Sequence, residues 1–324
     1  MNSRERVLAA LDCKVPDRVP YCELLICEPV ARQIVTDERE LLDKDVFKLF
    51  HCDNIPSLRC GPSVFSTPEY SKDGRAFVSK GTISCRDDLK NFHLQDPWDD
   101  SIYEPARKFI EENRSDLALN ALLPFALDPV IGSIGFQRFC ELLYEDPFVI
   151  EAMLDRYSEW MSVAVKKLAE IGYDFLWLAD DIAYKNGPMF SPEILHDMIM
   201  PYYRRVADAI TIPWIFHSDG NIQLLLDDLL SLGMNAIHPF EPGAMDPVWF
   251  KKEYGKEFCL VGNIDLNTLG LGTPEDVEKE TKERIEQLSE GGGYIVSSAN
   301  SIADYCKAEN VLAISAAINK YGQY

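Results

Sequence analysis

The amino-acid sequence predicts an α/β protein, a (β/α)8 TIM barrel with an N-terminal helix and a β-hairpin insertion. From Leu117 onward, short apolar runs alternate with amphipathic stretches of ten or more residues, which is the rhythm of a parallel sheet with crossover helices. The chain has 324 residues, enough for the ~250 that such a barrel needs. A doubly wound open sheet is the alternative, but no GxGxxG motif follows any predicted strand, so its nucleotide-binding version lacks a phosphate loop.

The first third of the chain is less regular than the rest. We predict a short helix at residues 4–11, a first barrel strand at 19–24 and another helix at 28–35. Alternating segments at 75–78 and 82–85, with Lys72-Asp73-Gly74 as a turn signal, predict a β-hairpin. The second barrel strand is one of these segments or residues 54–58, and the sequence leaves that choice open.

Strands and helices alternate through the remainder of the chain. The predicted strands lie at residues 117–122, 174–179, 212–216, 236–239, 258–262 and 294–297. The predicted helices lie at residues 147–171, 192–210, 222–232, 246–254, 274–289 and 308–321. Ser191-Pro192-Glu193 and Thr273-Pro274-Glu275 each place a hydroxyl at the N-cap, proline at the first helical position and an acid in the first turn. No repeat or Gly/Ser linker interrupts the pattern, so residues 1–324 are expected to form a single domain.

Composition excludes several classes of protein. The chain has 32 Lys+Arg against 53 Asp+Glu, a formal charge of −21 without any basic run, so neither nucleic acid nor an anionic membrane surface is an expected partner. The longest apolar stretch, residues 117–136, is interrupted by Asn120, Asp128 and two prolines, and is too broken to span a membrane. Nine irregularly spaced cysteines without a CxxC pair indicate reduced thiols, and hence a cytoplasmic location.

Polar residues follow most of the predicted strands, at the end where a barrel carries its chemistry. They are Cys22-Glu23, Asp180-Asp181, His217-Ser218-Asp219-Gly220, His238 to Glu241, Asn263-Ile264-Asp265 and Ser298-Ala299-Asn300. Loops are polar in any protein, so one such group indicates little. Their recurrence on five consecutive strands predicts a polar pocket at the barrel mouth. The candidates for substrate binding there are Glu23, His238, Asn263, Asp265, Ser298 and Asn300.

His217 and Asp219 form the most specific pattern. In a His-x-Asp pair at a strand end, both side chains leave the backbone on the same side, at a spacing that can chelate a divalent ion. Glu241 is the preferred third ligand from another strand, with Asn300 or Asp180 as substitutes. Imidazole and oxygen donors suit zinc, iron or manganese. The structural alternative is that Asp219 caps the helix that begins near Asn221, while His217 bonds a backbone carbonyl.

Asp180 and Asp181 are candidate catalytic acids, together with His217 and Glu241. The two acids follow a strongly apolar strand, where buried carboxyl groups need partners, and pockets are where acids with shifted pKa values tend to lie. The structural alternative is that one of them pairs with Lys185 and the other caps the helix that begins at Pro192. For His238, a purely structural role is the alternative to substrate binding.

Several motifs resemble the uroporphyrinogen decarboxylase superfamily, particularly its cobamide-dependent methyltransferase branch. The N-terminal match is the run 4–11 followed by Pro16-Asp17-Arg18-Val19-Pro20. The second half matches in Asp180-Asp181, His217-Ser218-Asp219-Gly220-Asn221, His238-Pro239-Phe240-Glu241-Pro242, Gly262-Asn263-Ile264-Asp265 and Gly291-Gly292-Gly293-Tyr294. The resemblance covers residues 4–20 and most of 174–321, and implies a (β/α)8 barrel with its site at the C-terminal rim.

The resemblance implies two different chemistries. Decarboxylases of the family share an arginine-rich segment after the first strand. Its guanidinium groups pair with a substrate that has eight carboxylates. Here residues 21–35 contain only Arg32, with Glu23 and Glu28 added. Without a basic cradle the carboxylates of a polyanion would be buried unpaired. The decarboxylase activity is therefore not expected to carry over.

The methyltransferase branch holds zinc with a His-x-Cys pair after one strand and a second cysteine after the last, and that zinc activates a thiol. By position, His217 matches the histidine, whereas Asp219 and Asn300 replace the two cysteines. A zinc thiolate site of the coenzyme M type is therefore not expected. A harder set of oxygen and nitrogen donors can still hold a Lewis acid.

The missing thiolates and arginines indicate the other half of methyl transfer, in which the methyl group is removed from its donor, as in O-demethylation. We expect a methyltransferase that moves a methyl group from a small donor of the methoxyarene or methylamine type to the cobamide of a separate corrinoid protein. Zn²⁺ or another divalent metal at His217, Asp219 and Glu241, or a proton from Asp181, would stabilise the leaving atom. Related barrels often pair, which implies a homodimer.

Two alternatives stay open at this point. The first is a decarboxylase of a porphyrinogen or a smaller carboxylic acid, with Asp180 or Asp181 as proton donor. The second is a barrel without catalytic activity that only binds a ligand or the corrinoid partner.

Overall fold

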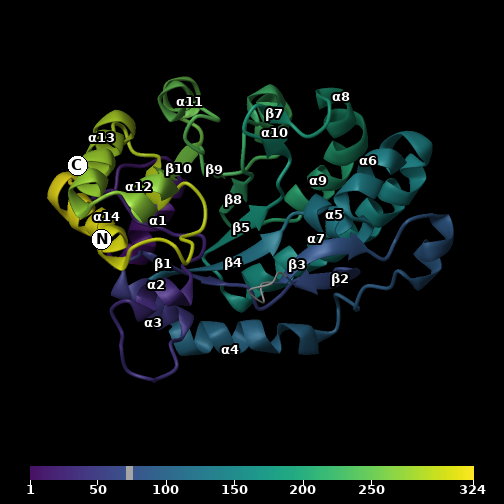
Figure 1. The fold of residues 1–324 in the computed structure, drawn as a ribbon, viewed down its shortest axis with the longest axis horizontal. Helices are drawn as coiled ribbons and strands as arrows, with labels where there is room; N and C mark the ends of the chain where they lie inside the picture. Colours follow the sequence, from purple (N-terminus) through teal and green to yellow (C-terminus); the bar gives the residue numbers. More distant parts are fainter. Residues whose placement is uncertain (71–75) are drawn as a thin grey trace.

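The computed structural model, which describes residues 1–70 and 76–324, is a curled parallel sheet surrounded by helices (Figure 1). The seven strands of this sheet are hydrogen-bonded in the order β1 (Asn54–Ser57), β4 (Ala118–Pro124), β5 (Phe175–Ala179), β8 (Trp214–His217), β9 (Ala236–His238), β10 (Cys259–Ile264) and β11 (Tyr294–Ser298). Every neighbouring pair is parallel. The predicted barrel is therefore confirmed, and residues 54–58 supply its first regular strand.

The predicted strand at residues 19–24 forms only an isolated bridge, yet it occupies the eighth place in the ring. Tyr21 bridges Val296 of β11 in parallel, and Val296 donates its N–H to the carbonyl of Pro20. On the other side, the Asn54 side chain accepts from the Glu23 N–H at 3.0 Å and donates to the Glu23 carbonyl at 3.0 Å. On this side the Asp53 N–H also donates to the Tyr21 carbonyl at 2.6 Å, so one backbone bond and the Asn54 side-chain amide close the ring.

The interior of the ring is apolar in its lower layers. Side chains from alternate strand positions meet there, among them Phe175, Trp177, Ile215 and Val261. Helix α1 (Ser3–Leu11) begins with a capping box between Asn2 and Glu5, and packs its apolar face against this cluster. The polar layer of the mouth lies at the carboxyl end of the strands, above these side chains.

Helices cover the outside of the ring (Figure 1). They are α2 (Glu28–Arg32), α3 (Asp43–Leu49), α4 (Glu104–Asn113), α5 (Leu127–Ile134), α6 (Phe136–Glu145), α7 (Pro147–Ile171), α8 (Pro192–Ile194), α9 (Met200–Ala207), α10 (Leu226–Leu230), α11 (Pro247–Tyr254), α12 (Leu266–Leu271), α13 (Pro274–Leu288) and α14 (Ala308–Tyr321). Helices α7 and α14 have the predicted bounds. The sequence did not predict α3, α4, α5, α6 or α12. Among the described residues, no helix combines the length and apolarity needed to cross a bilayer.

Two predicted elements differ in detail. The helix expected at residues 192–210 is divided into α8, a π-helical turn at Leu195–Ile199 and α9, because Pro201 lacks the N–H of a regular helix. The hairpin is confirmed as β2 (Ser66–Tyr70) paired with β3 (Ala76–Gly81), but residues 82–85 are not one of its strands. Ile83 instead donates its N–H to the carbonyl of Ser133 in α5. The expected turn at residues 72–74 lies outside the described residues.

A buried ion network ties α1 to the start of β1. The Asp53 side chain is 1% exposed and accepts hydrogen bonds from Arg6 at 2.9 Å, from both Arg18 terminal nitrogens at 3.0 Å and from the Tyr21 N–H at 2.9 Å. A buried carboxylate with this many donors is well compensated. Its removal would leave the Arg6 guanidinium, whose side chain is 9% exposed, without its buried partner.

We expect Asp53→Ala to lower the free energy of unfolding by about 3 kcal/mol, because Arg6 then keeps only its half-exposed partner Asp17 and the Tyr21 N–H loses its acceptor. Denaturant unfolding followed by circular dichroism measures this value. The matched control is Asp37→Ala, since Asp37 pairs with Arg39 on the surface, where both side chains are more than half exposed. The control should change stability by no more than about 0.5 kcal/mol. Equal effects of the two substitutions would contradict the assignment.

Candidate functional site

The mouth of the barrel is built by residues that continue the inward-facing positions of β5, β8 and β9. Ala179 is paired with His217, and His217 is paired with His238 across the parallel strands. Asp181 and Asp219 lie two residues beyond Ala179 and His217, on the same side of their chains. Gly220 turns the chain back with φ of +81°, at a point where a Cβ atom would lie 2.6 Å from the Tyr184 carbonyl oxygen. Only glycine fits this close approach.

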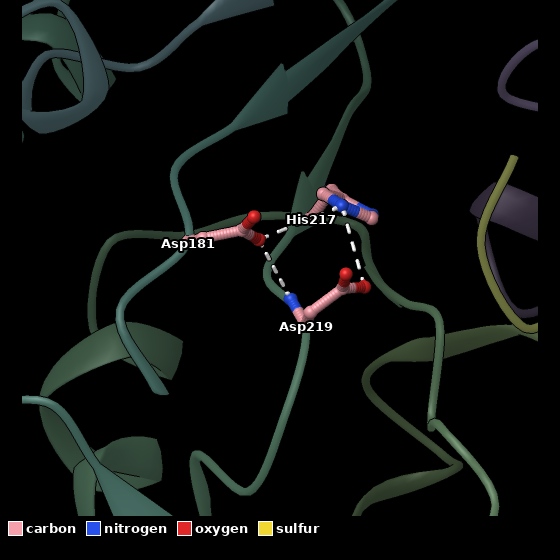
Figure 2. A group of neighbouring side chains, drawn as sticks. All are labelled: Asp181, His217 and Asp219. Carbon is pink, nitrogen blue, oxygen red and sulfur yellow. Dashed lines mark hydrogen bonds and ion pairs between the residues drawn. The ribbon is translucent and has the colours of Figure 1, made fainter. Parts of the chain in front are cut away.

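Asp181, His217 and Asp219 point toward one another (Figure 2). One ligand atom from each lies within 4.8 Å of the others. His217 Nε2 is 3.8 Å from Asp181 Oδ1 and 3.7 Å from Asp219 Oδ1, too far for hydrogen bonds. Two ligands of a tetrahedral zinc ion, each about 2.1 Å from the metal, are about 3.4 Å apart, so the spacing suits a shared cation.

His238 contacts the Nδ1 side of the His217 ring, opposite the Nε2 atom that faces the two aspartates. The two Nδ1 atoms are 2.6 Å apart, and His238 Nε2 lies 3.3 Å from the carbonyl oxygen of Ser298. Burial lowers the pKa of His217 to about 4, although the charge of Asp181 opposes this shift. His217 is therefore neutral at pH 7, which is the form of imidazole that binds metals.

Carboxyl groups crowd the same space. Burial raises the pKa of Asp219 to about 7, helped by the charges of Asp181 and Glu241, whereas a hydrogen bond from Asn300 opposes the shift. Burial also raises the pKa of Asp128, and the charges of Asp180 and Asp181 add to it. A cation or a proton at this point would relieve the repulsion.

Two adjoining cavities open onto this cluster. One, of about 310 Å³, has an apolar wall of Leu24, Leu58, Leu122, Leu123 and Pro124 opposite Asp128, Asp181, His217, Asp219 and Asn300. The other, of about 280 Å³, shares Asp219 and Asn300 and adds Lys185, Glu241, Asp265 and Tyr305. In the described part of the chain, no lysine or arginine lines the first cavity. It is suited to a small neutral or cationic ligand with an apolar portion.

The donor set fits a divalent metal. Asp219 Oδ1 is buried, faces His217 Nε2 and has no hydrogen-bond partner among the described residues. An orphaned oxygen beside an imidazole nitrogen is what a cation would satisfy. The set has Asp181 where the sequence predicted Glu241. Glu241 lies in the adjoining cavity, close enough to influence Asp219 electrostatically but outside the cluster of three.

The structure places the remaining predicted residues in different surroundings. Asn300 donates to Asp219 Oδ2, and Asp265 lines the second cavity while its side chain caps α12. Asn263 is buried and donates to the carbonyl of Phe240. Asn300 and Asp265 therefore line the mouth, whereas Asn263 is absent from the described lining of both cavities.

Asp180 faces away from the mouth. Its buried carboxylate accepts from the backbone N–H groups of residues 125–128, at 2.7–3.2 Å, and from the Tyr203 hydroxyl at 2.8 Å. It thus caps the start of α5, and the structural alternative for this pair of acids is the better account of Asp180, although α5 rather than the Pro192 helix is capped. A side chain with five donors has no capacity left for a substrate.

Glu23 and Ser298 also face away from the cavity. Their neighbours Cys22, Leu24 and Ile295 belong to the inner cluster, whereas Tyr21 and Val296 belong to the outer one, so alternation places both side chains behind the strands. The Ser298 hydroxyl donates to Glu23 at 2.6 Å and the Ser298 N–H at 3.0 Å. Burial raises the pKa of Glu23 to about 8, although these hydrogen bonds oppose the shift.

Sequence reasoning missed Asp128, Lys185 and the leucine wall as parts of the site. Asp128 accepts from the Asp181 N–H at 3.2 Å and lines the first cavity. The signal was present, since Asp128 is a charged residue inside a long apolar stretch just after a strand. It was used only to exclude a membrane span.

Stability should fall as pH rises from about 5 to about 8, because folded Glu23, with a pKa of about 8, keeps a proton that the unfolded chain releases near pH 4.3. Each pH unit in that window should cost about 1 kcal/mol from this group. Glu23→Gln should remove that contribution, so its stability relative to wild type should increase with pH. Denaturant unfolding at pH 5, 6.5 and 8 tests this. Glu257→Gln, at an exposed carboxylate, is the control and should show the same pH dependence of stability as wild type. The same pH dependence in Glu23→Gln would refute the prediction.

Comparisons with known proteins identify relatives of two kinds. The chain is 28% identical over 197 residues to a methylated-thiol–coenzyme M methyltransferase of Methanosarcina mazei, and 25% identical over 189 residues to a methylcobamide:CoM methyltransferase of Methanosarcina barkeri. These matches cover 59% and 58% of this chain but only 51% and 54% of the relatives, so the chain spans about half of their length. It is also 22% identical over 327 residues to a uroporphyrinogen decarboxylase of Syntrophotalea carbinolica, which covers 96% of this chain and 89% of that protein.

Structural similarity agrees with the barrel. A methyltransferase from Methanosarcina mazei superposes with a TM-score of 0.77 at 19% identity, over 99% of both chains. This likeness shows the fold. Residues 121–321 match the family model of uroporphyrinogen decarboxylase (URO-D), which is more than half of the sequence, and this confirms the resemblance seen in its motifs. The chain therefore belongs to the URO-D family.

Proposed function

We propose that the chain is a corrinoid-dependent methyltransferase, which takes a methyl group from a small donor of the methoxyarene or methylamine type and passes it to the cobamide of a partner protein. The observation that carries the proposal is the first cavity, where three carboxyl groups and a neutral histidine face a leucine wall with no basic residue among its described lining. The names of the two Methanosarcina relatives support methyl transfer. The acids favour a neutral or cationic donor over an anionic one.

The chain's own residues have three tasks in this reaction. The leucines hold the apolar part of the donor and exclude water, which strengthens electrostatic interactions at the reacting atom. Asp181, His217 and Asp219 surround the position of the donor heteroatom. Asp219, whose pKa is raised to about 7 mainly by burial, keeps a proton near neutral pH that can pass to the leaving oxygen or nitrogen.

A divalent ion bound by the same three residues would supply Lewis-acid stabilisation of the leaving atom in place of that proton. The cobamide of the partner supplies the low-valent cobalt that accepts the methyl group. Asp219 can serve in either form, because it binds a metal when ionised and donates a proton when neutral. Metal analysis of protein purified without chelator distinguishes the two states.

A second candidate function is decarboxylation of a carboxylic acid. It is favoured by the match to a uroporphyrinogen decarboxylase along 96% of the chain. The lining of the first cavity disfavours it, because a carboxylate substrate would meet Asp128, Asp181 and Asp219 without a basic partner. The second cavity contains Lys185, which could pair with one carboxylate but not with a polyanion.

The deciding experiment mixes the purified protein with a reduced corrinoid protein and a panel of methoxyarenes and methylamines. Formation of methyl-cobalt, followed by its absorbance, is the expected result. A parallel reaction with coproporphyrinogen and uroporphyrinogen is assayed for released CO₂. Release of CO₂ without methyl-cobalt from any donor would overturn the proposal in favour of the decarboxylase.

Asp219→Asn should lower the rate of methyl-cobalt formation by about 100-fold, because the amide can neither donate the proton nor bind a metal as an anion. The matched control is Asp208→Asn, at an exposed position after α9, which should keep the wild-type rate. Rates are measured at saturating donor and corrinoid protein. An Asp219→Asn variant as active as the control would remove Asp219 from the reaction.

A further inference from the structure

We propose that His238 is a positioning residue that fixes the tautomer of His217, so that His217 presents a bare Nε2 lone pair to the space between Asp181 and Asp219. The inference deepens the proposed function by describing the metal-binding state of the same site. It rests on a chain of hydrogen bonds whose direction is set at one end by a backbone carbonyl.

The chain begins at the carbonyl of Ser298, which can only accept. His238 Nε2 lies 3.3 Å from this oxygen, so this nitrogen must carry the hydrogen. Ser297 Oγ, which donates to Glu23, is 3.4 Å from the same nitrogen and offers a second acceptor. Both neighbours therefore favour the Nε2–H form of His238.

The tautomer of His238 sets the direction of the hydrogen bond between His238 and His217. In neutral His238 a hydrogen on Nε2 leaves Nδ1 as an acceptor, and this Nδ1 is 2.6 Å from Nδ1 of His217. Two bare nitrogens at that distance would repel, so His217 must donate from Nδ1. His238 is fully buried and its hydrogen-bond partners, His217, the Ser298 carbonyl and Ser297 Oγ, carry no negative charge, which favours the neutral ring.

The consequence appears on the opposite side of the His217 ring. With its hydrogen on Nδ1, neutral His217 has a free lone pair on Nε2, which faces Asp181 Oδ1 at 3.8 Å and Asp219 Oδ1 at 3.7 Å. The two distances are too long for Nε2–H donation, which agrees with a nitrogen that has no hydrogen. Lone pairs from His217 and, when Asp219 is ionised, from both carboxylates thus face one another. Asp181 Oδ1 accepts the Asp219 N–H at 2.9 Å and keeps a second lone pair, so the three side chains can still bind a cation.

The position of His238 is set by the sheet and not by a flexible loop. It is paired with His217 between β8 and β9, its side chain is fully buried, and its ring packs edge-on against Trp177 with centroids 4.9 Å apart. His238 can therefore hold the plane of the His217 ring as well as its tautomer. This is how outer partners of metal-binding histidines act.

The test uses two substitutions. His238→Asn keeps an acceptor near the position of Nδ1, whereas His238→Leu removes it with a side chain of similar size. Zinc affinity, measured by competition with a chromophoric chelator, should fall by about 10- to 100-fold in His238→Leu and be largely retained in His238→Asn. His196→Leu is the matched control, because His196 is exposed and is not part of the cluster of Asp181, His217 and Asp219. This variant should bind zinc as wild type does.

A spectroscopic measurement tests the tautomer directly. The chain has only five histidines, so ¹⁵N-histidine labelling gives a tractable long-range ¹H–¹⁵N spectrum of metal-free protein, in which His217→Gln identifies the His217 signals. We expect the Nδ1–H form in wild type and its loss in His238→Leu. The Nε2–H form in wild type, or unchanged zinc affinity in His238→Leu, would overturn the inference. If His238→Leu does not fold, the wild-type spectrum still decides, and it does so whether or not methyl transfer is observed.

Discussion

The alternation of side chains along the strands of a closed ring is the constraint on which the rest of this structure depends. In a barrel one face of each strand points inward, so residues two apart share the interior while their neighbours are sent to the helix layer. This rule brings His217, Asp219 and Asp181 into one mouth from two strands that are far apart in sequence. It sends Glu23 and Ser298 behind the strands, where they bond each other. The ring itself closes through residues 20–23, where one backbone bond from Asp53 and the Asn54 amide take the place of a regular ladder.

The alternation rule also separates the two acids that are adjacent in sequence. Asp180 turns outward and its carboxylate accepts hydrogen bonds from the start of α5, whereas Asp181 turns toward His217. The same division makes the mouth a place where carboxyl groups meet with few compensating donors, and burial then raises the pKa of Asp219 and Asp128. The acids of this protein fall into two classes: those such as Asp53 that are saturated by donors and stabilise the fold, and those at the mouth that are not saturated. Only the second class is available for chemistry.

The sequence predicted the ring and most of its strands because their signals are local: apolar runs of five or six residues between helix starts such as Thr273-Pro274-Glu275. It also predicted that His217 and Asp219 share a face, since strand parity is a local property. It could not choose between Asp181 and Glu241 as their neighbour, because that depends on how the loops after β5 and β9 fold back. Asp128 was missed for the same reason: its approach to Asp181 joins residues 53 positions apart. Glu23 was assigned to the mouth because polarity at a strand end was counted without regard to parity.

The relatives of this chain are named for two chemistries, and these would place opposite requirements on the charge at the mouth. A polycarboxylate requires cations that are in place before it binds, because each desolvated carboxylate costs several kcal/mol if it is left unpaired. A first cavity lined by Asp128, Asp181 and Asp219 imposes the opposite requirement, since it is stabilised by bringing in positive charge or a proton. Histidine fits this setting only if it stays neutral, and burial next to His238 keeps His217 in that form. The acids, the neutral imidazole and the leucine wall therefore form one consistent environment, which favours a neutral or cationic ligand with an apolar part over an anion.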